Sequence, residues 1–322
     1  MSTIQLSKTE QEYIINGIHF EHRIDGRKLL DYRDIQIEPS VLRGTHGSSR
    51  IRLGDTEILC GISVELYKIE SNKTLDERST DSNTQNQKPK ISDLLHFSLE
   101  CSPNASPDFQ GRGGEKTAEE ISNLLLKSWT NNSKLVSALQ IIENKYYWRV
   151  YIDLLVLECG GTLLDAASLA CLTALRTTIF PRTEVEEGDE FQPVILLVDD
   201  KMSGVKITET DFNSCLDEAP IIITIHKIGH SHIVDPSLEE ECCSSAAIRV
   251  ALSNKSYKNG NFLMMVKSGN KSLAPTSIKE MMIAAQDCFE SLDKELNRVY
   301  QNRKMVDLDM VSSEGAVGYM IE

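Results

Sequence analysis

The most constraining feature of this chain is the segment Glu158-Cys159-Gly160-Gly161-Thr162-Leu163-Leu164-Asp165, in which two glycines separate two apolar runs. The preceding run, residues 145–157, is typical of a buried strand, and the run from Leu163 to about Thr178, closed by Pro181, is typical of a helix. A strand that passes directly into a helix predicts α/β architecture. This layout can also hold phosphate, because a helix N-terminus offers unpaired N–H groups and a positive dipole end.

The first turn of the predicted helix argues against a bound phosphate. It supplies no cation, since Thr162 is followed by Leu163 and Leu164. Thr162 is predicted to be the N-cap, and Asp165 to reach back to it as in a capping box, so the free N–H groups would have partners within the chain. The Asp165 carboxylate would also repel an anion. We therefore expect the diglycine turn to bind no phosphate.

Composition limits the class of protein. With 322 residues, 40% hydrophobic and 25% charged, the chain is expected to be globular, as one large domain or two. Its net charge of −14 predicts weak binding to RNA by the chain alone, unless its basic residues cluster. No apolar run approaches the length of a membrane span and no signal-peptide core is seen, so a cytosolic or nuclear location is expected.

Cysteine usage points away from a structural metal. The eight cysteines are scattered, mostly in apolar runs, and none forms a C-x-x-C pair. They are predicted to be buried, reduced thiols.

Hydrophobic periodicity predicts further elements on both sides of the diglycine. Helices are expected at residues 8–17, with Tyr13 and Ile14 facing the core and Gly17 ending the helix, and at 117–129 and 276–300. Strands of a first sheet are expected at 35–38, 48–53, 57–66 and 94–101, and those of a second at 194–198, 221–228, 233–234, 246–252 and 262–267. Gly54-Asp55 predicts a hairpin, and the acidic residues 184–190 predict a solvated connector. The expected fold class is α/β, or α+β, with two mixed sheets and helices between them.

Several short motifs follow one another along the chain. They are Arg23-Ile24-Asp25-Gly26-Arg27, Asp31-Tyr32-Arg33, Gly47-Ser48-Ser49-Arg50, Asp55-Thr56-Glu57-Ile58-Leu59, Leu157-Glu158-Cys159-Gly160-Gly161-Thr162 and Val234-Asp235-Pro236-Ser237-Leu238-Glu239-Glu240-Glu241. Together they resemble the RNase PH superfamily over roughly residues 8–300. Phe109-Gln110-Gly111-Arg112-Gly113-Gly114, and the lack of an arginine after Gly-Gly-Thr, are most similar to a ring subunit of the eukaryotic RNA exosome.

The resemblance implies the RNase PH fold, of the ribosomal protein S5 domain 2-like type. It implies a single domain over residues 1–303, with a polar, disordered insertion at about 70–91 and a tail at 304–322 outside the pattern. Implied partners are related ring subunits, S1/KH cap subunits, an associated nuclease and single-stranded RNA in the ring channel, with no DNA, membrane or cofactor. The implied role is RNA degradation and rRNA processing in the nucleus, nucleolus and cytoplasm.

The same resemblance marks a degenerate catalytic site. Active members of the superfamily cleave RNA with inorganic phosphate, which an arginine and hydroxyls hold, and bind a metal through paired carboxylates. Asp235 and Glu241 stand where the two metal-side aspartates occur, whereas Leu163 stands where the phosphate-binding arginine occurs. Because losing a preorganised cation removes much transition-state stabilisation, we expect a non-catalytic subunit with vestigial carboxylates. An active phosphorolytic 3′-to-5′ exoribonuclease and a small-molecule-binding α/β domain remain the alternatives.

Structural roles compete with these functional ones. Asp235-Pro236 is a turn signal, and Ser237 with Glu240 predicts a capping box, which we favour over a Mg²⁺ site. The histidines at 226, 230 and 232 would project to one side of a strand, but they lack a carboxylate or thiol at matching spacing for zinc.

Several basic and aromatic residues are candidates for RNA contact. Arg112, in a glycine-rich loop, is the candidate for RNA contact, with a solvated loop residue as the alternative. For Arg23, Arg27 and Arg33 we favour ion pairs within the chain or at a subunit interface. The aromatic triplet at 146–148 is predicted to pack in the core or an interface, with Tyr147 opposite its neighbours.

Overall fold

The computed structural model describes residues 6–69, 89–130, 132–142, 145–181, 183–187, 193–197, 215–216 and 218–313. Of the predicted insertion at about 70–91, residues 70–88 lie outside the described residues. At its end Ile91 begins a short helix, α2 (Ile91–Leu94). Of the predicted tail, residues 314–322 also lie outside.

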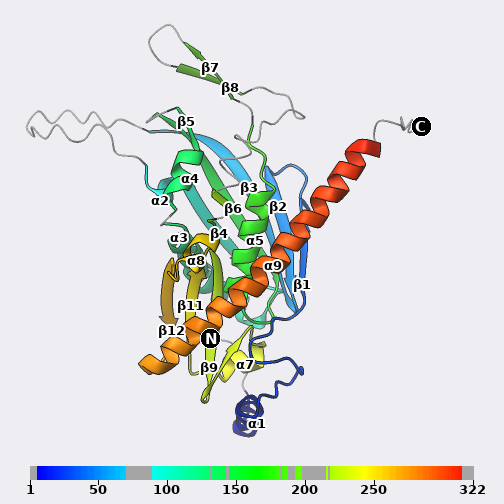
Figure 1. Ribbon diagram of the computed structural model, residues 1–322, viewed down its shortest axis with the longest axis vertical. Coiled ribbons are helices and arrows are strands. Elements are labelled where there is room, and N and C mark those ends of the chain that lie inside the picture. The colour runs from blue at the N-terminus through cyan, green and yellow to red at the C-terminus, as the bar shows by residue number, and fades with distance from the viewer. Residues whose placement is uncertain are drawn as a thin grey trace, which may run out of the picture.

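A six-stranded sheet forms one layer of the molecule (Figure 1). Its order is β1 (Ile35–Pro39), β2 (Gly47–Leu53), β3 (Thr56–Lys68), β6 (Tyr146–Glu158) and β4 (Leu95–Cys101), with β5 (Gln140–Ile142) also paired to β6. The pairs are antiparallel except β4 with β6, which is parallel. The predicted hairpin is confirmed, since Leu53 pairs with Thr56 across the turn between β2 and β3.

Helix α5 (Leu163–Arg176) lies between this sheet and a second one, and every residue from Leu163 to Leu175 is buried. A helix that is apolar on all sides requires such a position. On one side Ser49 of β2 donates a hydrogen bond to the carbonyl of Ala170 at 2.8 Å. On the other side, helix α5 contacts β9.

The second sheet has the order β10 (Ser231–Val234), β9 (Ile221–Ile228), β11 (Ala246–Leu252) and β12 (Met264–Ser268). All its pairs are antiparallel, so the prediction of a mixed second sheet is wrong. Helix α9 (Pro275–Ser313) contacts β9 and β11 (Figure 1). Its residues Met281, Phe289 and Leu292 are buried. It continues past its predicted end at residue 300, into the segment predicted as a tail.

The remaining helices are short or lie at the edges of the fold. They are α1 (Lys8–His19), the 3₁₀ turn η1 (Pro107–Phe109), α3 (Gly113–Trp129), α4 (Ser133–Ala138), α7 (Leu238–Cys242) and α8 (Asn254–Lys258). In the part of the chain that the structure describes, no helix has the combination of length and apolar composition that crossing a membrane requires.

Helix α1 differs from its prediction in facing and in length. Ile14 and Ile18 are buried, whereas Tyr13 is 74% exposed, so the prediction that Tyr13 faces the core is wrong. Gly17 does not end the helix, which continues to His19. A Cβ at Gly17 would lie 2.9 Å from the carbonyl oxygen of His22, so glycine is required here because the following chain returns closely.

The acidic stretch is not simply a connector. Strand β7 (Thr183–Glu187) pairs with β8 (Pro193–Leu197) as a separate two-stranded ribbon, while residues 188–190 lie outside the described residues. The β-branched residues Thr183 and Val185 favour extended backbone despite the neighbouring charge. Strand β8 was predicted to join the second sheet, which is also wrong.

The prediction that the cysteines are buried is confirmed in part. Cys60, Cys171, Cys215 and Cys288 are buried and the other four are half-buried.

Candidate functional site

Asp235 lies in the turn between β10 and α7 and is completely buried. Its Oδ1 accepts a hydrogen bond from Arg33 Nη2 at 2.7 Å. Its Oδ2 accepts from the backbone N–H and Nε of Arg33 at 2.8 and 2.9 Å, and from Arg27 Nη1 at 3.0 Å. Both oxygens of this carboxylate are therefore engaged by cations of the same chain.

Arg33 extends the network to the diglycine turn, and Arg27 extends it to Asp25. Arg33 Nη1 donates to the carbonyl of Gly160 at 2.8 Å, and Arg27 Nε pairs with Asp25 at 2.6 Å. Because hydrogen-bonded ion pairs with arginine are strong and geometrically specific, Arg33 fixes the β10–α7 turn against the start of α5.

Arg23 forms a second buried pair beside the first. Its Nη2 lies 2.6 Å from Glu240 Oε2, and its guanidinium also donates to the carbonyls of Val234 and Asp235 at 3.0 and 2.8 Å. Glu240 also closes the capping box of α7, where its backbone N–H donates to Ser237 Oγ at 3.3 Å. The predictions of this capping box and of ion pairs within the chain for Arg23, Arg27 and Arg33 are confirmed.

The diglycine allows close packing of several chain segments. Gly161 has φ +100°, and a Cβ there would lie 2.7 Å from the carbonyl oxygen of Pro236. A Cβ at Gly160 would lie 2.6 Å from the Cβ of Asp55. The chain's own backbone thus lies directly against the turn that the sequence marked as a possible phosphate cradle.

The predicted capping box of α5 is wrong. Thr162 adopts φ +53°, caps no N–H group with its side chain, and donates its hydroxyl to the Pro236 carbonyl at 3.2 Å. Asp165 instead accepts hydrogen bonds from the N–H and hydroxyl of Thr224 at 2.9 and 2.6 Å, and from the hydroxyl of Tyr32 at 3.3 Å. These partners lie on other elements, so tertiary contacts replace the local cap.

Asp165 is an unusual buried acid. It is 0% exposed, and burial raises its pKa to about 7, while the hydrogen bonds from Thr224 oppose that rise. Sequence reasoning missed Thr224 and Tyr32 as its partners. A signal was present, because Thr224 interrupts the apolar run Ile221-Ile222-Ile223-Thr224-Ile225.

The other members of the expected catalytic set do not complete a metal site. Glu241 is exposed on α7, and Leu163 is buried in the first turn of α5. A hard cation such as Mg²⁺ needs carboxylate oxygens with free lone pairs, and those of Asp235 are directed at guanidinium groups. Within the described ranges, no group of three or more His, Cys, Asp or Glu residues is placed to hold a metal.

The histidines do not come together either. His226 on β9 pairs with Ile233, and His232 on β10 pairs with Lys227, so the two side chains face opposite sides of the sheet. The prediction that they project to one side is wrong, because the turn containing His230 separates the two strands. His226 Nδ1 lies 3.2 Å from Ser244 Oγ, and burial lowers the pKa of His226 to about 4.

Arg112 and the aromatic triplet remain. Arg112 is exposed at the N-cap of α3, and its guanidinium has no hydrogen-bond or ion-pair partner among the described residues. Tyr147 and Trp148 are 1% and 3% exposed, which confirms their predicted packing role.

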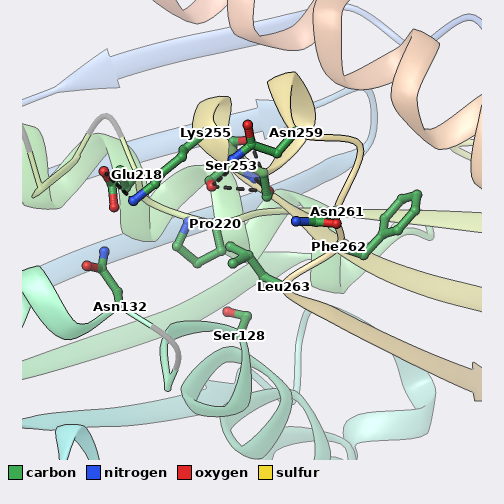
Figure 2. Close-up of a pocket in the computed structure, with 11 residues that line it drawn as sticks. Ser128, Asn132, Glu218, Pro220, Ser253, Lys255, Asn259, Asn261, Phe262 and Leu263 are labelled. Atoms are coloured by element: carbon green, nitrogen blue, oxygen red, sulfur yellow. Dashed lines mark hydrogen bonds and ion pairs between the residues drawn. The ribbon is translucent and has the colours of Figure 1, made fainter.

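A cavity of about 430 Å³ opens between the C-terminal end of α3 and the α8 region (Figure 2). Its charged residues already pair with each other, since Lys255 Nζ lies 3.4 Å from Glu218 Oε1. Ser253 and Ser256, also in its lining, are used in the capping box of α8. No member of the Asp235 cluster lines this cavity.

Comparisons with known proteins agree with this architecture. The chain matches the 3′ exoribonuclease family, domain 1 over residues 31–181 and domain 2 over residues 218–288. A putative exosome complex exonuclease RRP42 of Dictyostelium discoideum is 29% identical, over 92% of this chain and 99% of that protein. An exosome complex component Rrp42 of Sulfurisphaera tokodaii is 30% identical, over 90% and 96%.

Solved structures show the same fold. A chain of the Archaeoglobus fulgidus exosome with RNA bound to the active site has a TM-score of 0.65 at 22% identity, over 89% of this chain and 98% of that one. A chain of an archaeal exosome core has a TM-score of 0.63 at 22% identity, over 89% and 96%. Matches to both domains of one family, along nearly the whole length of its curated relatives, place this chain in the RNase PH family of 3′ exoribonucleases.

Proposed function

We propose that this chain is a non-catalytic structural subunit of an exosome-type ring. One observation carries the proposal: the carboxylate that stands at a metal-side position, Asp235, is buried and shared by Arg27 and Arg33 of the same chain. A metal bound there would have to displace both guanidiniums, and Arg33 would lose its carboxylate partner while Arg27 kept only Asp25. Breaking a buried pair in this way is strongly unfavourable.

The phosphate side of the site supports the same proposal. Leu163 offers no cation, and the carbonyl oxygen of Pro236 faces Gly161, where an incoming phosphate would meet another oxygen. Phosphorolysis needs the anion both held and aimed at the scissile phosphorus. The names of the relatives do not separate a catalytic from a non-catalytic subunit, because one is called a putative exonuclease and the other a component.

The wider role follows from the relatives. We propose that the chain assembles with related ring subunits, S1/KH cap subunits and a nuclease, and that single-stranded RNA passes through the ring to that nuclease. Arg112 is the candidate contact to RNA, because it is exposed and unpaired at the start of α3. RNA degradation and rRNA maturation in the nucleus, nucleolus and cytoplasm belong to this proposal.

Two measurements test the proposal. The purified chain, incubated with RNA, inorganic phosphate and Mg²⁺, should release no nucleoside diphosphate, and native mass spectrometry after co-expression with related ring subunits should find it in a heteromer. Nucleoside diphosphate release that Glu241→Gln abolishes and Glu239→Gln does not would establish the phosphorolytic alternative instead. Both substitutions lie on exposed positions of α7, so they leave the buried ion pairs in place.

A further inference from the structure

The segment around α1 carries the three most exposed large hydrophobic residues among those whose exposure the structure describes. Tyr13, Phe20 and Ile24 are 74%, 69% and 59% exposed, and the other large hydrophobic residues on the described surface are 50% exposed or less. Single exposed hydrophobic residues are ordinary, but several within a dozen positions of one another mark an interaction site.

Two of these residues frame a cavity. Tyr13 and Ile24 line a hollow of about 300 Å³, together with Leu6, Thr9 and Ile14, and with Glu10 and Glu239. We call these seven residues the N-terminal groove. A hollow of this volume accommodates one large aliphatic or aromatic side chain of a partner.

The groove is formed by a helix that is packed in place against the second sheet. Ile14 and Ile18 pack with Ile228 and Ile233 of the second sheet in a cluster separate from the main core. The capping box of Ser7 and Glu10 fixes the start of α1, which lies at one end of the molecule, away from the large sheet (Figure 1). A groove formed before binding keeps the entropic cost of docking low.

The charge of the groove selects its occupant. Both charged residues that line it are glutamates. Glu10 accepts a hydrogen bond from the uncharged N–H of Ser7 at 2.7 Å, and Glu239 has no ion-pair partner among the described residues. An acidic partner would be repelled, and a neutral one would leave two carboxylates partly desolvated without compensation.

We propose that the N-terminal groove docks a polypeptide segment of a neighbouring subunit. This segment inserts an aliphatic or aromatic side chain between Tyr13 and Ile24 and places a lysine or arginine against Glu10 and Glu239. The inference rests on the proposed function in taking the partner from the same assembly, and it adds which surface is used and what chemistry the partner presents.

Hydrogen–deuterium exchange of the isolated chain and of the co-expressed assembly tests the docking. Peptides covering residues 9–24 should exchange more slowly in the assembly, and zero-length crosslinking should join Glu239 to a lysine of another subunit. Tyr13→Ser with Ile24→Ser should weaken the affinity for the partner subunit about 100-fold, because two apolar side chains lose their burial. Glu239→Lys should weaken it about tenfold, an effect that falls as salt rises.

Matched controls lie outside the lining of the groove. Ile283→Ser on α9 removes a side chain that is 50% exposed, and Glu119→Lys on α3 reverses an exposed charge, so neither should change the affinity. All the substituted residues are exposed, and the variants are therefore expected to fold.

The outcomes separate this inference from the proposed function. If the assembly forms and protects other segments but not residues 9–24, the ring proposal stands and the groove proposal is overturned. If the chain assembles with no other subunit, both fail. Two further results would assign the groove to another occupant and overturn the proposal. One is protection of residues 9–24 in the isolated chain that disappears when residues 1–5 are deleted. The other is self-association of the isolated chain that Tyr13→Ser abolishes.

Discussion

Replacing Asp235 by alanine removes the carboxylate that Arg27 and Arg33 share. In the folded protein, Arg27 and Arg33 side chains are 14% and 10% exposed, so water reaches them poorly. Arg27 keeps Asp25 as a partner, and Arg33 keeps the Gly160 carbonyl. The substitution therefore leaves charges that are only partly compensated.

The expected loss follows from this geometry. Removing one partner of a buried ion pair typically costs 3–5 kcal/mol, and the partners that remain place Asp235→Ala at the lower end, about 3 kcal/mol. Glu241→Ala is the matched control, since Glu241 is exposed and belongs to neither of the buried ion pairs around Asp235 and Glu240. The free energy of unfolding of Glu241→Ala should be lower than that of the wild type by about 1 kcal/mol or less.

Urea unfolding at pH 7, followed by circular dichroism, measures both free energies. Asp235→Ala should lower the urea midpoint by about 1–2 M, and Glu241→Ala should change it much less. The reasoning is refuted if the two variants lose equal stability, or if Asp235→Ala unfolds at the wild-type midpoint. Either result would mean that the arginines do not depend on Asp235, and the position would then be open to a metal.

Three further predictions concern pH, packing and RNA. Burial raises the pKa of Asp165 from 3.8 to about 7, so the folded state holds the proton of this carboxyl more tightly than the unfolded state does. The contribution of Asp165 to the free energy of unfolding therefore falls by about 4 kcal/mol as pH rises from 3 to 8. Asp165→Asn should flatten that slope in urea midpoints measured across the range, and an unchanged slope would contradict it. Gly161→Ala should cost at least about 2 kcal/mol, since it adds a contact with Pro236 to a strained φ, whereas Gly26→Ala, with positive φ but open surroundings, should cost about 1 kcal/mol by thermal unfolding. Arg112→Glu should weaken RNA binding by the assembled ring, measured by filter binding, without altering assembly. Equal RNA affinity of the variant and wild-type rings would contradict an RNA contact by Arg112.

The sequence predicted elements best where a local pattern and its burial agree. The hairpin of β2 and β3, the helix that follows the diglycine and the capping box at Ser237 all follow from periodicity or from contacts within a few residues. The predicted cap at Thr162 failed for the opposite reason. Its hydroxyl binds Pro236, 74 residues away, and Asp165 binds Thr224, 59 residues away, which no local rule contains.

The site was predicted in its composition but not in its arrangement. Asp235, Glu241 and Leu163 were identified by position, and the arginines were assigned to ion pairs. Arg33 joins Asp235 to the diglycine because the chain after β10 passes beside residues 23–33. Only the tertiary structure shows this proximity. The histidines illustrate the same limit, because the turn at His230 determines which side of the sheet each one faces.

The pairing of Arg23 with Glu240 joins residues 217 positions apart. During synthesis, Arg23, Arg27 and Arg33 therefore leave the ribosome long before Asp235 and Glu240 exist. Until residue 240 has emerged, this basic segment lacks those two carboxylates, and Arg27 has only Asp25 as an acidic partner, although the finished protein is strongly acidic. A chain truncated after residue 220 should have these guanidiniums modified rapidly by phenylglyoxal, and the full-length chain slowly; equal rates would show that another group shields them first.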